Sequence, residues 1–126
     1  LQISQLAIPI ITIIYGEGGS GGALALACGD EVWMLENSTY SILSPEGFAS
    51  IMWKDSTKAD KAAELMQMVP QALLKQEIIE GIIPESEEHR KTCKNIEQVL
   101  LKRLNKLQEL PPKQLLANRK KRYRKF

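Results

Sequence analysis

The sequence predicts an α/β fold in which short buried strands alternate with helices. A continuous β-branched run over residues 8–15 is typical of a strand buried on both faces. A second apolar run over residues 31–35 follows a glycine-rich segment and a short Ala/Leu stretch. From about residue 57, apolar side chains instead recur at helical spacing.

Length and composition bound the fold. The 126 residues are enough for one domain, and 44% of them are hydrophobic, which allows a packed core. This excludes a disordered chain and a disulfide-stabilised miniprotein. No apolar run reaches the roughly 18 residues that a membrane-spanning helix needs. Because the chain has neither an initiator Met nor a signal-peptide pattern, we expect it to be a piece of a longer protein.

The first half of the chain consists of expected strands separated by glycines and turn residues. Pro9 near the start of the first strand is tolerated, since a strand end does not need its N–H. Five glycines then form a loop, and Gly29 is placed to end the short helix that follows it. The expected order is a strand over 8–15, a loop over 16–22, a helix over 23–28, and strands over 31–35 and 40–43.

The second half is expected to be mainly helical. Ser44 and Pro45 form a helix start, with a serine cap, Pro at the first helical position and the acidic Glu46 in the first turn. Pro70 interrupts the next helix, and a Pro-Pro pair breaks the long one. The expected order is helices from 45, from 57 and over 71–76, a strand-like edge over 78–84, a long helix over 86–110, and a last helix carrying the basic residues 119–125.

Charge divides the chain at about residue 85. Residues 1–85 carry 4 Lys/Arg against 11 Asp/Glu, a net charge of −7, whereas residues 86–126 carry 13 against 4, a net charge of +9. We therefore predict a core over 1–85 and a helical extension with a basic tail over 86–126. The tail, Arg119 to Lys125, suits a nucleic acid, an anionic membrane surface, an acidic face of a partner subunit, or a solvated helix end.

The cysteines indicate neither a disulfide framework nor a metal site. Cys28 and Cys93 lack metal-ligand spacing, and a single His cannot complete a zinc site. We expect no metal in this chain and a reducing compartment.

The glycine-rich loop matches two side-chain patterns of catalysis or binding. Gly16, Gly18 and Gly21 have the spacing of a dinucleotide-binding fingerprint, with the acidic Glu36 twenty residues on. The helix after the loop is short for a crossover between neighbouring parallel strands. Ser20 alternatively occupies the nucleophile position of a hydrolase elbow, but the only His of the chain lies in a charged run, residues 87–91, typical of a solvated helix start.

A third interpretation of the loop uses backbone amides. Adjacent glycines let a ligand approach the backbone closely, and a helix N-terminus directs free N–H groups outward. Gly21 and Gly22, which open the expected helix, have the layout of an oxyanion hole. The alternative is that the glycines only permit close packing of the helix on a strand.

The loop and several later segments resemble one family. Residues 16–25, Gly-Glu-Gly-Gly-Ser-Gly-Gly-Ala-Leu-Ala, closely resemble the glycine signature of the carboxyltransferase α subunits of multi-subunit acetyl-CoA carboxylase. The resemblance covers essentially the whole chain. It continues through residues 38–41, 44–47, 49–54, 82–85 and 118–119.

The resemblance implies a crotonase-like (ClpP/crotonase) fold, a spiral of ββα units, of which this chain would hold the C-terminal portion followed by a helical extension. It implies carboxyl transfer from carboxybiotin, on a biotin carboxyl carrier protein, to acetyl-CoA, giving malonyl-CoA for fatty acid synthesis. The implied partners are a carboxyltransferase β subunit in an α2β2 assembly and biotin carboxylase in a larger, ATP-binding complex. The implied location is the bacterial cytoplasm or the plastid stroma.

The resemblance also implies roles for the loop residues. Gly21 and Gly22 would hold the biotin ureido oxygen through their N–H groups, and the ureido nitrogen would take the acetyl methyl proton. Gly18 and Gly19 would shape the turn. Together with Ser20 they would bind the substrate, and Ser20 would not act as a nucleophile. Glu46 also matches a family position, although a helix start explains it. The alternatives are another crotonase-fold acyl-CoA enzyme, such as a hydratase, or a propionyl-CoA type carboxyltransferase.

Overall fold

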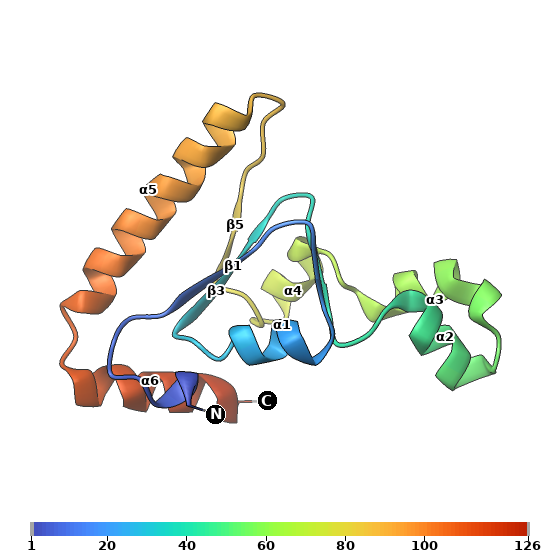
Figure 1. The fold of residues 1–126 in the computed structure, drawn as a ribbon, viewed down its shortest axis with the longest axis horizontal. Coiled ribbons are helices and arrows are strands. Elements are labelled where there is room, and N and C mark those ends of the chain that lie inside the picture. Colours follow the sequence, from blue (N-terminus) through green and yellow to red (C-terminus); the bar gives the residue numbers. More distant parts are fainter. Residues whose placement is uncertain (1, 126) are drawn as a thin grey trace.

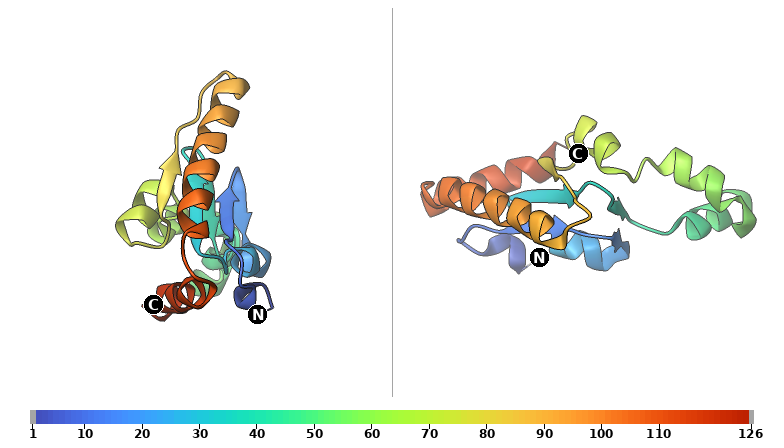
Figure 2. Two further views of the ribbon diagram at one scale, coloured as in Figure 1. Left: turned by 90° about the vertical axis from the view of Figure 1, so that its left-hand side faces the viewer. Right: turned by 90° about the horizontal axis from the view of Figure 1, so that it is seen from above.

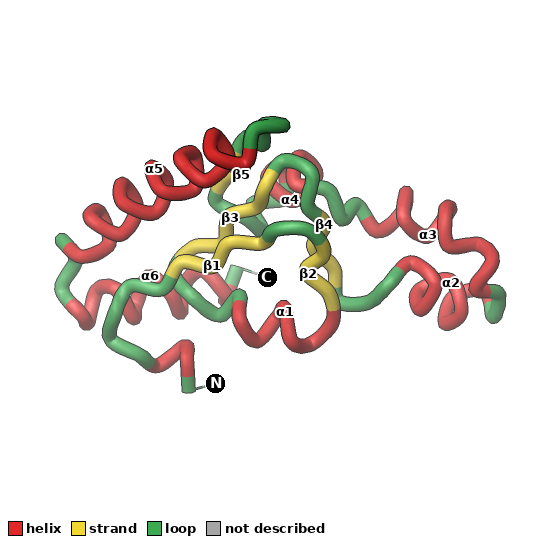
Figure 3. The backbone as a smooth tube through the Cα atoms, turned by 45° about the horizontal axis from the view of Figure 1, so that its top comes forward, coloured by secondary structure: helices red, strands yellow, loops and turns green. Residues whose placement is uncertain are grey.

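The computed structural model describes residues 2–125, which form two small parallel sheets surrounded by helices (Figure 1). One sheet has the strand order β1-β3-β5, and the other pairs β2 with β4. Along the chain, β1 leads into β2 and β3 leads into β4, so that the two strand pairs follow one another (Figure 3). The strands are β1 (Ile11–Ile14), β2 (Glu17–Gly19), β3 (Glu31–Leu35), β4 (Thr39–Ser41) and β5 (Gly81–Ile83).

The predicted helices are present, with shifted ends. The glycine-rich segment, expected to be a loop, instead contributes β2 and the first turn of α1. The helices are η1 (Ile3–Gln5), α1 (Ser20–Leu26), α2 (Pro45–Trp53), η2 (Ser56–Lys58), α3 (Ala59–Met66), α4 (Pro70–Lys75), α5 (His89–Gln108) and α6 (Pro112–Arg124). Among residues 2–125, no helix combines the length and the apolar character that crossing a membrane requires.

Gly29 has a different role from the predicted one. Helix α1 ends at Leu26 with Ala27 as its cap, so Gly29 does not terminate it. A Cβ atom at Gly29 would instead lie 2.7 Å from both Cγ2 and the carbonyl oxygen of Ile10. Glycine is therefore required here because the segment before β1 passes close to the backbone, not because of a left-handed turn.

The core lies around β3, as the continuous apolar run predicts. Val32 and Met34 are buried in this strand, and Ile14 of β1, Leu73 of α4 and Ile79 pack into the same cluster. Both faces of β3 are covered, because Glu31 and Leu35 are buried as well. This explains why the strand lacks the polar alternation of a half-exposed sheet.

Helices α2 and α3 pack on each other beside the sheets and extend away from them (Figures 1 and 2). The predicted helix start is confirmed: the Ser44 hydroxyl oxygen accepts the Gly47 N–H at 3.1 Å, and Pro45 is the first helical residue. Ala62 on the predicted apolar stripe of α3 is fully buried. The pair of helices α2 and α3 is therefore specified by local capping and by its own apolar contacts.

The basic extension neutralises acidic residues of the first part of the chain. From β5, α5 runs down to α6, which passes η1 near the N-terminus (Figure 1). The prediction of a solvated helix end is therefore wrong for two tail arginines, since Arg119 is only 2% exposed and Arg122 is half-buried. The ion pairs are Arg103–Glu31, Arg119–Asp30, Arg122–Glu80 and Lys125–Glu77.

Candidate functional site

The glycine turn between β2 and α1 is shaped by its first glycines. Gly16 has a φ of +66°, and its carbonyl oxygen accepts the Thr39 N–H at 2.8 Å, which aligns β2 with β4. A Cβ atom at Gly18 would lie 2.9 Å from Cγ2 of Ile14 and 3.5 Å from Cδ2 of Tyr40. Gly18 therefore permits close packing between strands, which differs from the helix-on-strand packing considered for Gly21 and Gly22.

Ser20 makes the sharp step from strand to helix. Its φ is +60°, a left-handed conformation that costs a non-glycine residue on the order of 1–3 kcal/mol. This strand–turn–helix geometry is shared with a nucleophile elbow. Within residues 2–125, however, no histidine or carboxylate is hydrogen-bonded to Ser20. His89 is exposed at the first residue of α5, whose start lies far from α1 (Figure 1), so it does not serve as a base for this serine.

Gly21 and Gly22 differ from Gly18 because nothing in the chain crowds them. Both are exposed, and a Cβ atom at either position would have no heavy atom within 4 Å. Each glycine in a helix costs roughly 1 kcal/mol relative to alanine. Packing within the described residues therefore gives no reason for two glycines in a seven-residue helix.

The N–H groups of these glycines are available to a ligand. They lie in the first turn of α1, where amides have no partner inside the helix. In the described part of the chain, no carbonyl outside α1 accepts a hydrogen bond from them. The two adjacent donors can stabilise an oxygen that gains negative charge, which is the chemistry of an oxyanion hole.

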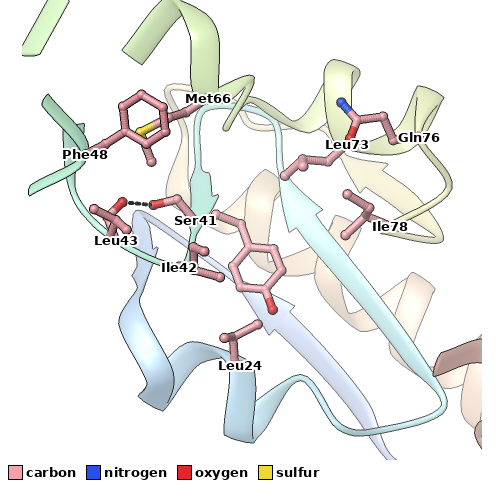
Figure 4. A pocket seen from close by; sticks show the side chains of 10 residues that line it. Leu24, Ser41, Ile42, Leu43, Phe48, Met66, Leu73, Gln76 and Ile78 are labelled. Carbon is pink, nitrogen blue, oxygen red and sulfur yellow. Dashed lines mark hydrogen bonds between the residues drawn. The ribbon is translucent and has the colours of Figure 1, made fainter. Parts of the chain in front are cut away.

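An apolar pocket of about 390 Å³ begins one turn further along α1 (Figure 4). Ser41 of β4 is one of the few polar residues lining it, and its hydroxyl donates to the Leu43 carbonyl oxygen at 2.8 Å. Burial raises the pKa of the Tyr40 phenol, which is therefore neutral at physiological pH. Such a lining suits an apolar group rather than a charged one. The apolar lining residues are Leu24, Ile42, Leu43, Phe48, Met66, Leu73 and Ile78.

Sequence reasoning did not find this pocket. Its walls come from α1, β4, α2, α3 and α4, which are separated along the chain. The local signals were that Leu24, Tyr40 and Ser41 lie in segments of the family resemblance. These segments gave no indication that α3 and α4 lie against β4.

Glu36 and Glu46, the two acidic residues singled out in the sequence, both have structural roles. Glu36, the acid of the dinucleotide fingerprint, accepts the Glu85 N–H at 3.2 Å, and the Glu85 carboxylate accepts the Asn37 N–H at 2.6 Å. This exchange ties the turn after β3 to the segment after β5. Glu46 is exposed in the first turn of α2, the position that the helix-start interpretation predicts.

No grouping of His, Cys, Asp and Glu that could hold a metal occurs within residues 2–125. Cys28 and Cys93 are free thiols in the structure. The Cys28 thiol donates to the Leu24 carbonyl oxygen at 3.3 Å, inside the chain's own backbone turn.

Sequence comparisons agree on one family. A family model described as acetyl co-enzyme A carboxylase carboxyltransferase-like matches residues 1–126. The acetyl-coenzyme A carboxylase carboxyl transferase subunit alpha of Streptococcus sanguinis (strain SK36) is 50% identical over 127 residues, covering 100% of this chain and 50% of that protein. The subunit of Streptococcus pneumoniae (strain Hungary19A-6) gives the same identity and coverage. The chain thus spans about half the length of the curated relatives it matches.

A solved structure confirms the fold. The crystal structure of transcarboxylase 12S, with methylmalonyl-coenzyme A and methylmalonic acid bound, matches with a TM-score of 0.57 at 20% sequence identity. The match covers 76% of this chain and 21% of that chain. The predicted α/β fold of crotonase-like type is therefore confirmed.

Proposed function

The chain belongs to the acetyl-CoA carboxylase carboxyltransferase-like family, and we propose that it forms part of a carboxyltransferase α subunit that makes malonyl-CoA from acetyl-CoA. The carboxyl donor is carboxybiotin on a biotin carboxyl carrier protein. Support comes from the family match over the whole chain and from relatives at 50% identity that are carboxyl transferase α subunits. The backbone geometry at Gly21 and Gly22 connects this chain to the chemistry.

The two amides have a defined task in this reaction. When bound, carboxybiotin would supply the carboxyl group: its bond between the ureido nitrogen and the carboxyl carbon would break and leave negative charge on the ureido group. The freed nitrogen would then accept a proton from the acetyl methyl group, whose carbon would form the new C–C bond to the released carboxyl carbon. Gly21 and Gly22 donate to the ureido oxygen, where negative charge develops. Open space beside both residues leaves room for a ring at hydrogen-bonding distance. The carrying observation is this exposed pair of donors, because packing does not explain the glycines.

The neighbouring residues shape the approach to the pair. Gly18 lets β2 pass against Ile14, and the left-handed Ser20 turns the backbone sharply into α1. Gly19, in extended conformation before that step, has no heavy atom near its Cβ position and leaves the same side open. In the proposal these three residues border the substrate, and none of them reacts with it.

The remaining features of the assembly belong to the same proposal. A carboxyltransferase β subunit completes the site in an α2β2 assembly, which fits a donor pair exposed on the surface of this chain. Biotin carboxylase supplies the ATP-dependent step elsewhere in the complex. The division into a core over 1–85 and an extension over 86–126 is retained, with a bacterial cytoplasmic or plastid stromal location.

The decisive experiment replaces Gly22 by Val in the full-length α subunit assembled with its β partner. The branched side chain would fill the space beside the amide and should lower malonyl-CoA formation by roughly 10²–10³-fold, the effect of losing one oxyanion donor. Ala25→Val, an exposed position of the same helix, is the matched control and should retain activity. Assembly is checked by size-exclusion chromatography. Unchanged turnover in an intact Gly22→Val complex would remove the proposed role.

The same assay separates the alternatives of substrate class. Acetyl-CoA and propionyl-CoA are compared as acceptors at equal concentrations, with the product identified by mass spectrometry. Preferential carboxylation of acetyl-CoA supports the proposal. Preference for propionyl-CoA, or hydration of an enoyl-CoA without carboxylation, would assign the chain to one of the other acyl-CoA reactions.

A further inference from the structure

Two hydroxyl groups from distant segments bind the C-terminal end of α1. The Tyr123 hydroxyl, on the last turn of α6, donates to the Ala27 carbonyl oxygen, and the Gly29 carbonyl oxygen lies 3.0 Å away as a second acceptor. The Thr12 hydroxyl of β1 donates to the Leu26 carbonyl oxygen at 2.7 Å. Carbonyl groups in the last turn of a helix lack partners within the helix. Both hydroxyls therefore act as external caps of α1.

Helix α1 needs support of this kind. It has only seven residues, and isolated helices of that length are marginal in water. Gly21 and Gly22 in its first turn add backbone freedom. At its N-terminal side, pairing of Gly18 with Tyr40 fixes the preceding strand β2. The direction of α1 is thus set by β2 at one end and by the two hydroxyls at the other.

The Tyr123 phenol is itself held in place. The Arg122 guanidinium carbon lies 5.1 Å from the centre of the Tyr123 ring. Arg122 also donates to the Glu80 carboxylate at 2.6 Å, and that carboxylate accepts the Val32 N–H of β3 at 2.6 Å. The phenol is therefore coupled to the central sheet. Burial raises the pKa of Tyr123, so the hydroxyl keeps its proton and remains a donor at physiological pH.

We infer that Tyr123 is a positioning residue for the amide pair of Gly21 and Gly22. By holding the last turn of α1, its hydroxyl sets the direction of the helix axis and hence the direction of the N–H groups in the first turn. Ala27, the C-cap of α1, lies six residues beyond Gly21, about 9 Å along the helix axis. The inference rests on the proposed function, because the direction of these amides affects turnover only if they stabilise developing charge.

The test is Tyr123→Phe in the full-length α subunit assembled with its β partner. This change removes the hydroxyl and keeps the ring beneath Arg122. We expect kcat for malonyl-CoA formation to fall roughly tenfold, a partial loss compared with removing a donor, with KM for acetyl-CoA unchanged. Amide hydrogen exchange should accelerate in α1 and stay unchanged in β3. The control is Lys121→Ala, an exposed residue of the same helix, which should alter neither quantity.

A second variant covers the case in which Tyr123→Phe does not assemble. Thr12→Val removes the other hydroxyl cap at the same end of α1, and it should also lower kcat and accelerate exchange in α1. Its nearly unchanged side-chain volume preserves the packing of β1. If Thr12→Val retains wild-type kcat in that case, the inference is overturned.

The outcomes separate the two proposals. A lower kcat together with faster exchange confined to α1 supports the positioning role. Wild-type kcat in Tyr123→Phe, when Gly22→Val is inactive, overturns the positioning role and leaves the proposed function standing. A lower kcat with unchanged exchange in α1 also overturns it, because the residue then acts elsewhere. Full activity of Gly22→Val overturns the proposed function, and the positioning role with it.

Discussion

The Arg119 side chain is the strongest single link between the basic extension and the rest of the chain, and its removal should be severely destabilising. Its guanidinium makes two hydrogen bonds to the Asp30 carboxylate, both at 2.9 Å. It also donates to the carbonyl oxygens of Ser4, Leu6 and Ile8 at 3.0, 2.7 and 2.8 Å. One side chain therefore joins α6, the segment before β3 and the N-terminal segment.

The expected loss of stability follows from the burial of the Asp30 carboxylate. Asp30 has a side chain only 5% exposed. Arg119→Met would leave its carboxylate with the Ile10 N–H at 2.8 Å as its remaining donor among residues 2–125. Breaking a buried ion pair by removing one partner costs about 3–5 kcal/mol. Since a domain is stable by about 5–15 kcal/mol in total, this loss is a large fraction of the free energy of unfolding.

A lysine at the same position gives an intermediate test. Arg119→Lys retains the positive charge, but an ammonium group has three donors and cannot form the planar, forked contact with Asp30. At least two of the five hydrogen bonds are then lost, and we expect a destabilisation of about 1–3 kcal/mol. The free energy of unfolding should thus decrease from wild type to Arg119→Lys to Arg119→Met. This order is a stricter prediction than either single value.

Urea unfolding followed by circular dichroism measures the three free energies, and constant m-values check that the variants unfold in the same way. Lys120→Met is the matched control, because this neighbour is exposed and should change stability by no more than about 0.5 kcal/mol. If Arg119→Met does not fold, Arg119→Lys still gives a measurable free energy of unfolding. A loss below about 1 kcal/mol in Arg119→Met would refute the reasoning, since a buried carboxylate would have lost its partner without cost.

Two further predictions concern other parts of the fold. Gly29→Ala should destabilise by about 1–3 kcal/mol through the clash with Ile10, whereas Gly21→Ala, in open space, should not; equal melting temperatures for both variants would contradict this. Hydrogen bonds from the Thr57 hydroxyl and N–H hold the pKa of Asp55 below its ordinary 3.8. Thr57→Val should therefore raise the pKa of Asp55 in an NMR titration. The stabilisation of the fold by ionised Asp55 is lost only as pH falls below about 3.8 toward the lower pKa of the folded state.

The elements with local or continuous signals were predicted well. The strand over 31–35 has the bounds of β3, because a short, nearly all apolar run that includes the β-branched Val32 and the aromatic Trp33 is typical of a strand covered on both faces. The start of α2 was equally clear, since Ser44 and Pro45 act through contacts within one helical turn. Such signals need no knowledge of distant segments.

Strand β2 was missed for the opposite reason. Its sequence, Glu17 to Gly19, has little β propensity and was interpreted as loop. It is a strand because β4 lies alongside it, with Gly18 opposite Tyr40. The apolar pocket was missed on the same ground, since its walls meet only after α3 and α4 have returned to the sheets. The amide pair could be proposed because both donors are adjacent in sequence, whereas Tyr123 contacts α1 across 96 residues.

The basic tail shows how a charge pattern in the sequence can be interpreted more closely. Counting charges identified an acidic and a basic part but left the partner of the tail open, because the ion pairs span 42 to 89 residues. Within α6, however, Arg119 and Arg122 lie three residues apart on one helical face, and both are withdrawn from solvent. Lys120 and Lys121 between them are exposed. Guanidinium groups suit forked, partly buried contacts with carboxylates, whereas ammonium groups are strongly hydrated. Arginines at helical spacing, with lysines between them, therefore favour docking against an acidic surface over a solvated tail.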